Sequence, residues 1–196
     1  MIAESITVAS VADVPWADVR KIFGQRGDPA RCWCQYFKIS NSEWNDNPAE
    51  RLEGLLCDQV RDQAIPPGVV AYLDGEPVGW CGVEPRPAYP RLLRSKVVTD
   101  GSHEHLDDDS VWAVSCFVVR VGYRRRGVST RLLRAAVDQA ARLGARTIEA
   151  YPVDTTERKR SAAELYHGTL SLFEAAGFEI VSRPSAGRAV VRMVVL

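Results

Sequence analysis

The stretch Val118-Val-Arg-Val-Gly-Tyr-Arg-Arg-Arg-Gly-Val-Ser-Thr-Arg-Leu-Leu133 carries most of the information about the fold. It begins at the end of an apolar run, Val111 to Val119, continues through a short basic turn and reaches an amphipathic pattern near Gly127. This order predicts a strand, a tight turn and a helix N-terminus, where unpaired backbone amides and the positive end of the helix dipole attract phosphate. Gly127 lets a ligand approach the backbone, and the arginines at 124–126 add positive charge. The stretch therefore predicts an anion-binding turn.

Two motifs carry a resemblance to a known family. Residues 124–129 read Arg-Arg-Arg-Gly-Val-Ser and resemble the acetyl-CoA-binding signature Gln/Arg-x-x-Gly-x-Gly/Ala of the GCN5-related N-acetyltransferase (GNAT) superfamily. Ser129 replaces the final Gly or Ala, and we expect this small hydroxyl-bearing residue to preserve binding. The segment Phe173-Glu-Ala-Ala-Gly-Phe178 resembles a second motif, Tyr-x-x-x-Gly-Phe. The Cys-Trp-Cys segment at 32–34 and residues 149–154 resemble the corresponding segments of a bacterial subgroup of this superfamily whose substrate is unassigned.

The resemblance implies an α+β fold. We expect a mixed, mostly antiparallel central sheet of about seven strands, flanked by helices and splayed at the central cofactor-binding strand. With 196 residues, 46% hydrophobic and 26% charged, the chain fits one N-acetyltransferase domain over residues 1–196. The formal net charge of +0 argues against nucleic acid and acidic membranes as partners.

Hydrophobic periodicity locates the individual elements. Strands are expected at 6–11, 69–73, 78–83, 111–119, 147–153, 178–182 and 189–195. Helices are expected from Asp13 to Phe23, after an Asn47-Pro-Ala-Glu50 capping box, at 128–143 and at 169–176. Residues 24–29 are interpreted as a turn-rich break, and residues 84–98 as irregular chain.

The resemblance also implies where acetyl-CoA binds. The central strand would part from its neighbour so that its free backbone groups pair with the pantetheine arm, and the turn would hold the diphosphate. Mere core packing and a solvated basic turn are the alternative interpretation. The expected cofactor-binding residues are Phe117, Val118, Val119, Arg124, Arg125, Arg126, Gly127, Val128, Ser129 and Thr130. No metal is expected, because Cys32 and Cys34 lack a second Cys/His pair at zinc spacing.

The resemblance implies direct attack of an amine on the thioester, without an acyl-enzyme. Many relatives protonate the leaving thiolate with a Tyr at the position of Phe173, which cannot donate a proton. Tyr166 is therefore the candidate general acid, against the alternative of an ordinary half-buried aromatic. Glu84 is the candidate general base, against a surface carboxylate with water carrying the proton instead.

Two aromatic residues, Trp33 and Tyr36, are candidates for lining the acceptor pocket, although they would also suit packing of the first helices on the sheet. The expected acceptor is the primary amine of a small molecule. A non-catalytic acyl-CoA-binding or sensor module is one alternative, and a protein N-terminal or lysine acetyltransferase is another. Homodimers are common in the superfamily, and the sequence alone does not decide whether this chain forms one.

The number of cysteines and the first residues indicate the cellular compartment in which the protein is expected. Five cysteines, an odd number, with three of them in apolar runs, argue against a disulfide framework. The first residues lack a signal-peptide pattern, and no apolar run is long enough to span a bilayer. We therefore expect a cytoplasmic protein with reduced thiols.

Overall fold

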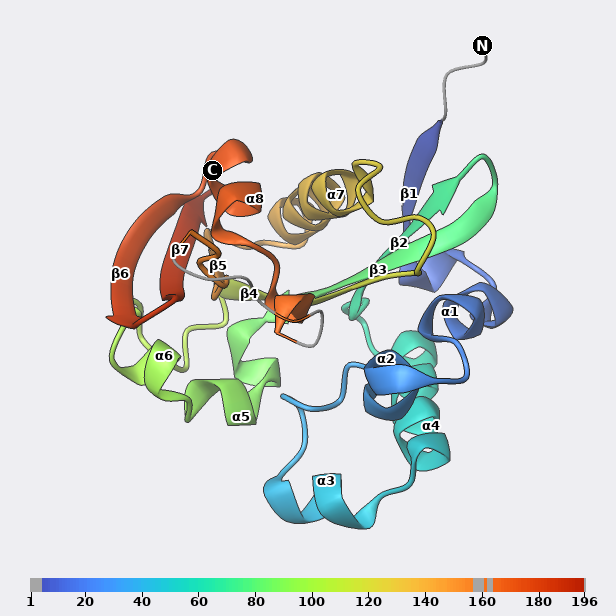
Figure 1. The fold of residues 1–196 in the computed structure, drawn as a ribbon. Coiled ribbons are helices and arrows are strands. Elements are labelled where there is room, and N and C mark those ends of the chain that lie inside the picture. The colour runs from blue at the N-terminus through green and yellow to red at the C-terminus, as the bar shows by residue number, and fades with distance from the viewer. Residues whose placement is uncertain (1–4, 157–160, 162–163, 196) are drawn as a thin grey trace.

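The computed structural model describes residues 5–156, 161 and 164–195. Within these residues one seven-stranded sheet has the order β1-β2-β3-β4-β5-β7-β6 (Figure 1). All neighbouring strands are antiparallel except β4 and β5, which are parallel. The strands are β1 (Ile6–Ser10), β2 (Gly68–Leu73), β3 (Glu76–Pro85), β4 (Val111–Val119), β5 (Thr147–Ala150), β6 (Glu179–Ser185) and β7 (Arg188–Val194). The predicted mixed, mostly antiparallel sheet is confirmed.

Helices cover both faces of the sheet (Figure 1). One face carries α7 (Val128–Arg142) and α8 (Leu170–Ala175). The other face carries α1 (Trp16–Phe23), α2 (Gly27–Cys32), α3 (Asn41–Asp46), α4 (Ala49–Asp62), α5 (Pro90–Leu93) and α6 (Lys96–Thr99). The described residues also form three short 3₁₀ turns: η1 (Val11–Asp13), η2 (Arg86–Ala88) and η3 (Leu165–His167).

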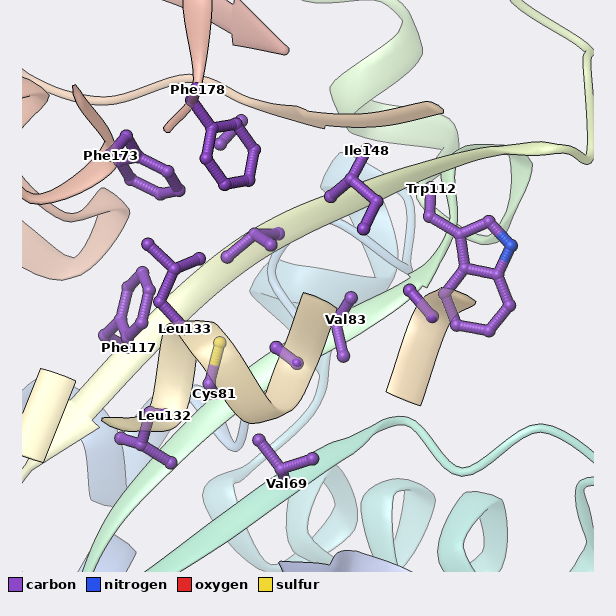
Figure 2. Packing of buried hydrophobic residues seen from close by; sticks show 14 of the residues in the cluster. Val69, Cys81, Val83, Trp112, Phe117, Leu132, Leu133, Ile148, Phe173 and Phe178 are labelled. Carbon is purple, nitrogen blue, oxygen red and sulfur yellow. The ribbon is translucent and has the colours of Figure 1, made fainter. Parts of the chain in front are cut away.

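The largest hydrophobic cluster lies between the sheet and the α7–α8 layer. Helix α7 buries Val128, Leu132, Ala136 and Ala140, a spacing of four that keeps one helical stripe against the strands. Figure 2 shows Leu132 and Leu133 over the strand residues Cys81 and Val83, with Phe173 and Phe178 beyond them. This packing fixes the start of α7 against the central strands.

The capping box predicted at Asn47–Glu50 is wrong. Asn47 is the C-cap of α3, because its N–H is bonded to the Glu43 carbonyl at 3.1 Å. The capping box lies one helix earlier, where the Glu43 N–H donates to Ser40 Oγ at 3.2 Å and the Ser40 N–H to Glu43 Oε2 at 2.8 Å. Pro48 precedes α4 without a side-chain cap.

Two other segments are more ordered than the sequence predicted. Helix α2 begins at Gly27, inside the expected break, and residues 84–98 hold the end of β3, η2, α5 and part of α6. These elements are only three to six residues long where they are complete, too short for periodicity to reveal. No helix formed by the described residues has the length and apolar character needed to cross a membrane.

Candidate active site

The central feature is a parting between the parallel strands β4 and β5. Their ladder runs from Val111 opposite Thr147 to Val114 opposite Ala150. Strand β5 ends there, whereas β4 continues to Val119. Beyond β5, the chain forms its next bridges with Thr169 and Arg188 rather than with β4. On this side of β4, residues 115–119 therefore have no strand partner within the described part of the chain, and the predicted splay is confirmed.

An irregularity on the other side of β4 accompanies the parting. The β3–β4 ladder shifts register between Gly82 and Val83, which pair with Cys116 and Val114. Ser115 is therefore the extra residue of a β-bulge, which bends the strand and increases its local twist. The Ser115 hydroxyl donates to the Gly82 carbonyl at 3.5 Å. The bulge and the end of β5 fall at the same level of the sheet.

A glycine lets the chain pass close to β4 at the parting. Gly168 has φ +78°, and a Cβ there would lie 2.9 Å from Phe173 Cε2 and 3.2 Å from Phe117 Cε2. The Phe117 and Phe173 rings pack edge to face, with centroids 6.1 Å apart, and Figure 2 shows them on the α7 side of the sheet. Phe173 is fully buried. Its position supplies packing and no proton donor.

The basic turn after β4 is fixed at its first residue. The Arg120 guanidinium forms an ion pair with Glu76 and donates to the Pro77 carbonyl at 2.7 Å. The Tyr123 N–H closes the turn by donating to the Arg120 carbonyl at 3.0 Å. Arg120 and Arg126 lie over the Tyr123 ring, 5.1 and 5.7 Å from its centroid. The turn is therefore held against β3 while residues 124–127 are exposed.

The N-terminus of α7 is open toward solvent. Gly127 is its N-cap, with φ +80° and no side-chain cap, and a Cβ there would meet no atom within 4 Å. The Arg131 N–H donates to the Gly127 carbonyl at 3.2 Å, so the amides before Arg131 precede the regular helical bonds. Arg125 has a left-handed φ of 60°. An exposed turn that presents successive amides is an anion-binding geometry.

Close packing brings this helix end to the sheet. On β3, a Cβ at Gly79 would lie 2.8 Å from Val128 Cγ1 and 3.0 Å from Leu132 Cδ1. Gly79 pairs with Val119, the last residue of β4. The first turn of α7 thus lies beside the end of the free edge of β4. A glycine inside a strand indicates such a close approach, so Gly79 is the sequence signal that could have located this contact.

On the opposite face, four aromatic rings follow one another. The centroid separations are 5.0 Å from Tyr36 to Phe37, 6.3 Å from Phe37 to Tyr166 and 4.1 Å from Tyr166 to His167. Tyr36 is 38% exposed. Burial raises the pKa of Tyr166 to about 12, although Arg188 opposes the shift. The Tyr166 hydroxyl is therefore protonated at neutral pH.

His167 reaches the bulge itself. Burial, with the positive charge of Arg188, lowers its pKa to about 3, while a hydrogen bond to the Ser115 backbone opposes the shift. The imidazole is therefore neutral at ordinary pH and connects η3 to β4. Tyr166, its neighbour in the chain, is held at the same level of the strand.

The two remaining candidate site residues, Trp33 and Glu84, are more deeply buried than Tyr36. Trp33 is 4% exposed and stacks on Phe23 at 4.8 Å, within the packing of α1 against the sheet. Glu84 is 3% exposed and forms an ion pair with Lys38, whose ammonium also donates to Gln59 at 2.8 Å. The structure thus brings Tyr36 and Tyr166 toward one another, while Trp33 and Glu84 occupy other environments. Lys38 is a partner that the sequence pattern did not reveal.

A buried ion pair organises the chain beside β5. Arg86 Nη1 lies 2.7 Å from Glu149 Oε2, and both side chains are fully buried. Ser102 and Tyr151 also donate to Glu149, at 2.7 and 2.9 Å, and Arg86 donates to the His105 carbonyl. This network joins η2 and the loop before β4 to the strand that parts from β4. No pattern in the sequence signalled it.

No group of three or more His, Cys, Asp or Glu side chains among the described residues is placed to hold a metal ion. The groups that the structure brings together at the site are open amides at a helix end, a strand edge without a partner strand and a protonated tyrosine. These groups suit binding of a phosphate-bearing cofactor and donation of a proton.

Comparisons with known proteins add the family. A sequence model described as the acetyltransferase (GNAT) family matches residues 31–169, whereas no curated protein matches the chain. A GCN5-related N-acetyltransferase from Kribbella flavida aligns at 18% identity and TM-score 0.52, over 97% of this chain and 98% of that one. A ribosomal-protein-alanine N-acetyltransferase from Brucella melitensis aligns at 16% and 0.55, over 96% and 99%. The PaiA N-acetyltransferase from Thermoplasma acidophilum, in complex with coenzyme A, aligns at 12% and 0.52, over 97% and 99%.

Proposed function

The chain belongs to the acetyltransferase (GNAT) family and is an N-acetyltransferase, and from this premise we propose how it works. Acetyl-CoA binds in the parting between β4 and β5, and a primary amine attacks the thioester directly. The observation that carries the proposal is the free edge of β4, residues 115–119, which ends beside the open N-terminus of α7. We further propose that residues 1–196 work as one domain, since a single sheet joins β1 to β7.

The diphosphate of acetyl-CoA is assigned to the turn. The amides of residues 125–130 would donate to the phosphate oxygens at the positive end of the α7 dipole. Ser129 and Thr130 contribute hydroxyl groups, and the guanidinium groups of Arg124, Arg125 and Arg126 lie on the same exposed turn. Val128 is buried beneath the turn, so its role is to seat the helix on the sheet.

The pantetheine arm is assigned to the free edge of β4. Within Phe117, Val118 and Val119, the backbone groups that face away from β3 would pair with its amides, as a neighbouring strand would. The side chains of Phe117 and Val118 are buried in the clusters on the two faces, which supports a backbone role for both residues. The arm would then lead from the turn toward the bulge at Ser115.

Tyr166 is proposed as the general acid that protonates the leaving thiolate. Its raised pKa, about 12, keeps the hydroxyl protonated at neutral pH, so the group carries a proton that it can donate. His167 holds the neighbouring backbone to the bulge, which supports a fixed position for the tyrosine. The buried Phe173 cannot take this role.

Glu84 is proposed as the proton acceptor for the attacking amine, reached through water. The carboxylate is almost fully buried and paired with Lys38, so direct contact with the amine would require that pair to open. Replacement of Glu84 by Gln should lower the rate at neutral pH and spare cofactor affinity. An unaltered rate would assign the proton to solvent instead.

A small molecule is proposed as the acceptor. Arg91 lies over the Tyr36 ring at 4.2 Å and donates to the Ser40 carbonyl at 2.7 Å, and its N–H donates to the Phe37 carbonyl at 3.1 Å. These contacts tie α5 to the segment before α3 and cover the acceptor side. Such a covered wall favours a compact amine over a folded protein surface. Trp33 is assigned a packing role, because its ring stacks on Trp16 and Phe23.

A cytoplasmic location is part of the proposal, because all five cysteines are free thiols and such thiols persist in reducing compartments. The direct test is release of coenzyme A from acetyl-CoA across a panel of small amines, peptides with free N-termini and lysine peptides. Turnover with a small amine supports the proposal. Turnover confined to peptides would show that the acceptor is a peptide or protein amine and not a small molecule. Tight binding of acetyl-CoA without any turnover would favour a sensor module.

A further inference from the structure

An unusual turn presents Cys34 to the sheet. Trp33 and Cys34 are consecutive non-glycine residues with left-handed φ values of 46° and 56°. Such conformations are strained for residues with a side chain and cluster at functional sites. The turn is closed by the Trp33 N–H donating to the Pro29 carbonyl at 3.0 Å and the Gln35 N–H to the Cys32 carbonyl at 2.9 Å. It directs the Cys34 side chain inward against β3.

The Cys34 sulfur packs against β3 at Gly82, where no side chain intervenes. The buried Trp80 indole N–H donates to Cys34 Sγ at 3.1 Å. A Cβ at Gly82 would lie 3.4 Å from the same sulfur, so the absence of a side chain at Gly82 leaves the space that Cys34 fills. Indole donation to sulfur stabilises electron density on that atom. Cys34 retains 8% exposure.

A second thiol lies beside the first. Cys116 is the cross-strand partner of Gly82, and directly opposed residues of an antiparallel pair share one face of the sheet. Cys116 is partly exposed. A hydrogen bond from the Cys116 thiol is the largest cause that lowers the pKa of Cys34, with Lys38 also lowering it, while the pKa of Cys116 is raised well above its usual value. Glu84 is the nearby charge that opposes the shift at Cys34.

We propose that Cys34 and Cys116 form an oxidant-sensitive thiol pair that hydrogen peroxide converts to a disulfide across the acceptor side of β4. The Cys34 thiolate attacks one peroxide oxygen, the O–O bond breaks, and the departing hydroxide takes a proton to leave as water. Cys34 is then a sulfenic acid. The Cys116 sulfur attacks it, the S–O bond breaks, and the Cys116 proton leaves with that oxygen as a second water. Two thiols lose two electrons, which reduce the peroxide to two waters.

The other thiols are less suited to this chemistry. Burial raises the pKa of Cys32 to about 11, which leaves little thiolate at neutral pH. Cys81 lies in the cluster on the α7 face, across the sheet from Cys34. Cys57 belongs to α4. The pair at 34 and 116 is therefore the assigned one.

The disulfide would have a consequence at the site. Cys116 lies in the free stretch of β4, next to the bulge, and Cys34 lies two residues before Tyr36. The bond would tie the acceptor wall to the strand along which acetyl-CoA is proposed to lie. Formation of the bond itself does not depend on the proposed acetyl transfer, so the two proposals can fail separately.

The experiment treats the full chain with hydrogen peroxide in the absence of coenzyme A, blocks free thiols, digests with trypsin without reduction and maps cross-links by mass spectrometry. A link between the peptide of residues 32–38 and the peptide that contains Cys116 is expected. Because Cys32 shares the first peptide, the link should persist in Cys32→Ser and disappear in Cys34→Ser and Cys116→Ser. Cys57→Ser is the matched control and should keep both the link and the untreated activity.

Dithiothreitol should remove the link and restore acetyl transfer to the untreated rate. A wild-type chain whose two thiols stay free or oxidise only singly would overturn the pair, and so would a link that requires Cys32. A linked protein that turns over at the untreated rate would overturn the effect on the acceptor side. If the chain shows no acetyl transfer before treatment, the cross-link map still decides the thiol chemistry.

Discussion

Val114 pairs with Ala150 in the last register position that β4 and β5 share. Strand β4 runs five residues further, to Val119. Among the residues that the structure describes, no strand covers that side of residues 115–119, although Arg124 donates to the Val119 carbonyl at 3.2 Å and His167 is bonded to the Ser115 backbone. An edge without a partner strand is the arrangement that an added strand or an extended ligand satisfies. The open N-terminus of α7 lies at the end of the same edge, so one extended molecule with a phosphate at one end can use both features.

Replacement of Gly127 by Asp should weaken acetyl-CoA binding by about tenfold or more. The carboxylate would enter the place assigned to the diphosphate, where like charges repel. Thermal unfolding with and without acetyl-CoA measures the effect, and the stabilisation by the ligand should shrink in step with the lost affinity. Gly122→Asp is the matched control, because Gly122 has φ +94° on the same turn and an added Cβ meets nothing within 4 Å. Equal losses in both variants would contradict the assigned position.

Replacement of Gly168 by Ala should destabilise the fold by about 2–4 kcal/mol. The Cβ would clash with Phe173 and Phe117 and force a left-handed φ on alanine. Urea unfolding measures the loss. Gly144→Ala separates the two causes, since Gly144 has φ +99° with nothing within 4 Å and should cost only about 1 kcal/mol. Similar losses in the two variants would show that the aromatic contact is unimportant.

Replacement of Tyr166 by Phe should lower kcat by about a hundredfold and leave acetyl-CoA affinity unchanged. The variant keeps the ring contact with His167 and removes only the proton. Because the pKa of Tyr166 is raised to about 12, the wild-type rate should show no loss from this group up to the ordinary tyrosine range near pH 10. Tyr72→Phe controls for a lost hydroxyl remote from the site, since Tyr72 donates to Asp18. Wild-type turnover in Tyr166→Phe would remove it as the acid.

Stability should fall as the pH is lowered from about 6.5 toward 3, in part because of His167. Its folded pKa is lowered to about 3, so in this window the unfolded chain binds a proton that the folded chain excludes. The contribution reaches about 2 kcal/mol at pH 5. Urea unfolding at pH 7.5 and pH 5 should show a smaller difference in His167→Gln than in wild type. The exposed His105 provides the control, and His105→Gln should keep the wild-type difference.

The elements that the sequence predicted well are those with long, one-sided patterns. Strand β4 was bounded correctly at Val111 and Val119 because it is a nearly unbroken apolar run. Helix α7 was found because its apolar positions repeat at helical spacing. Phe173 was recognised as unable to donate a proton, and the structure adds that its ring is buried against Phe117. These features are local, so the residues themselves carry the signal.

Features that depend on distant partners were not predicted. Lys38 and Glu84 are far apart in the sequence and meet where the segment between α2 and α3 packs against β3. The sequence predicts a capping box at Asn47 because Pro and Glu follow it, whereas the Ser40–Glu43 pair forms the cap in the structure. The sequence leaves Trp33 between an acceptor pocket and packing of the first helices, and only the structure shows that its ring stacks on Phe23. Composition identifies such residues as candidates, and only tertiary packing decides between them.

A crystal structure of the chain with coenzyme A tests the central claim most directly. The account predicts the diphosphate on the amides of residues 125–130 and the pantetheine arm along Phe117 to Val119, in the parting between β4 and β5. A coenzyme found elsewhere on the molecule, with that turn empty and the edge of β4 closed by the chain itself, would contradict it.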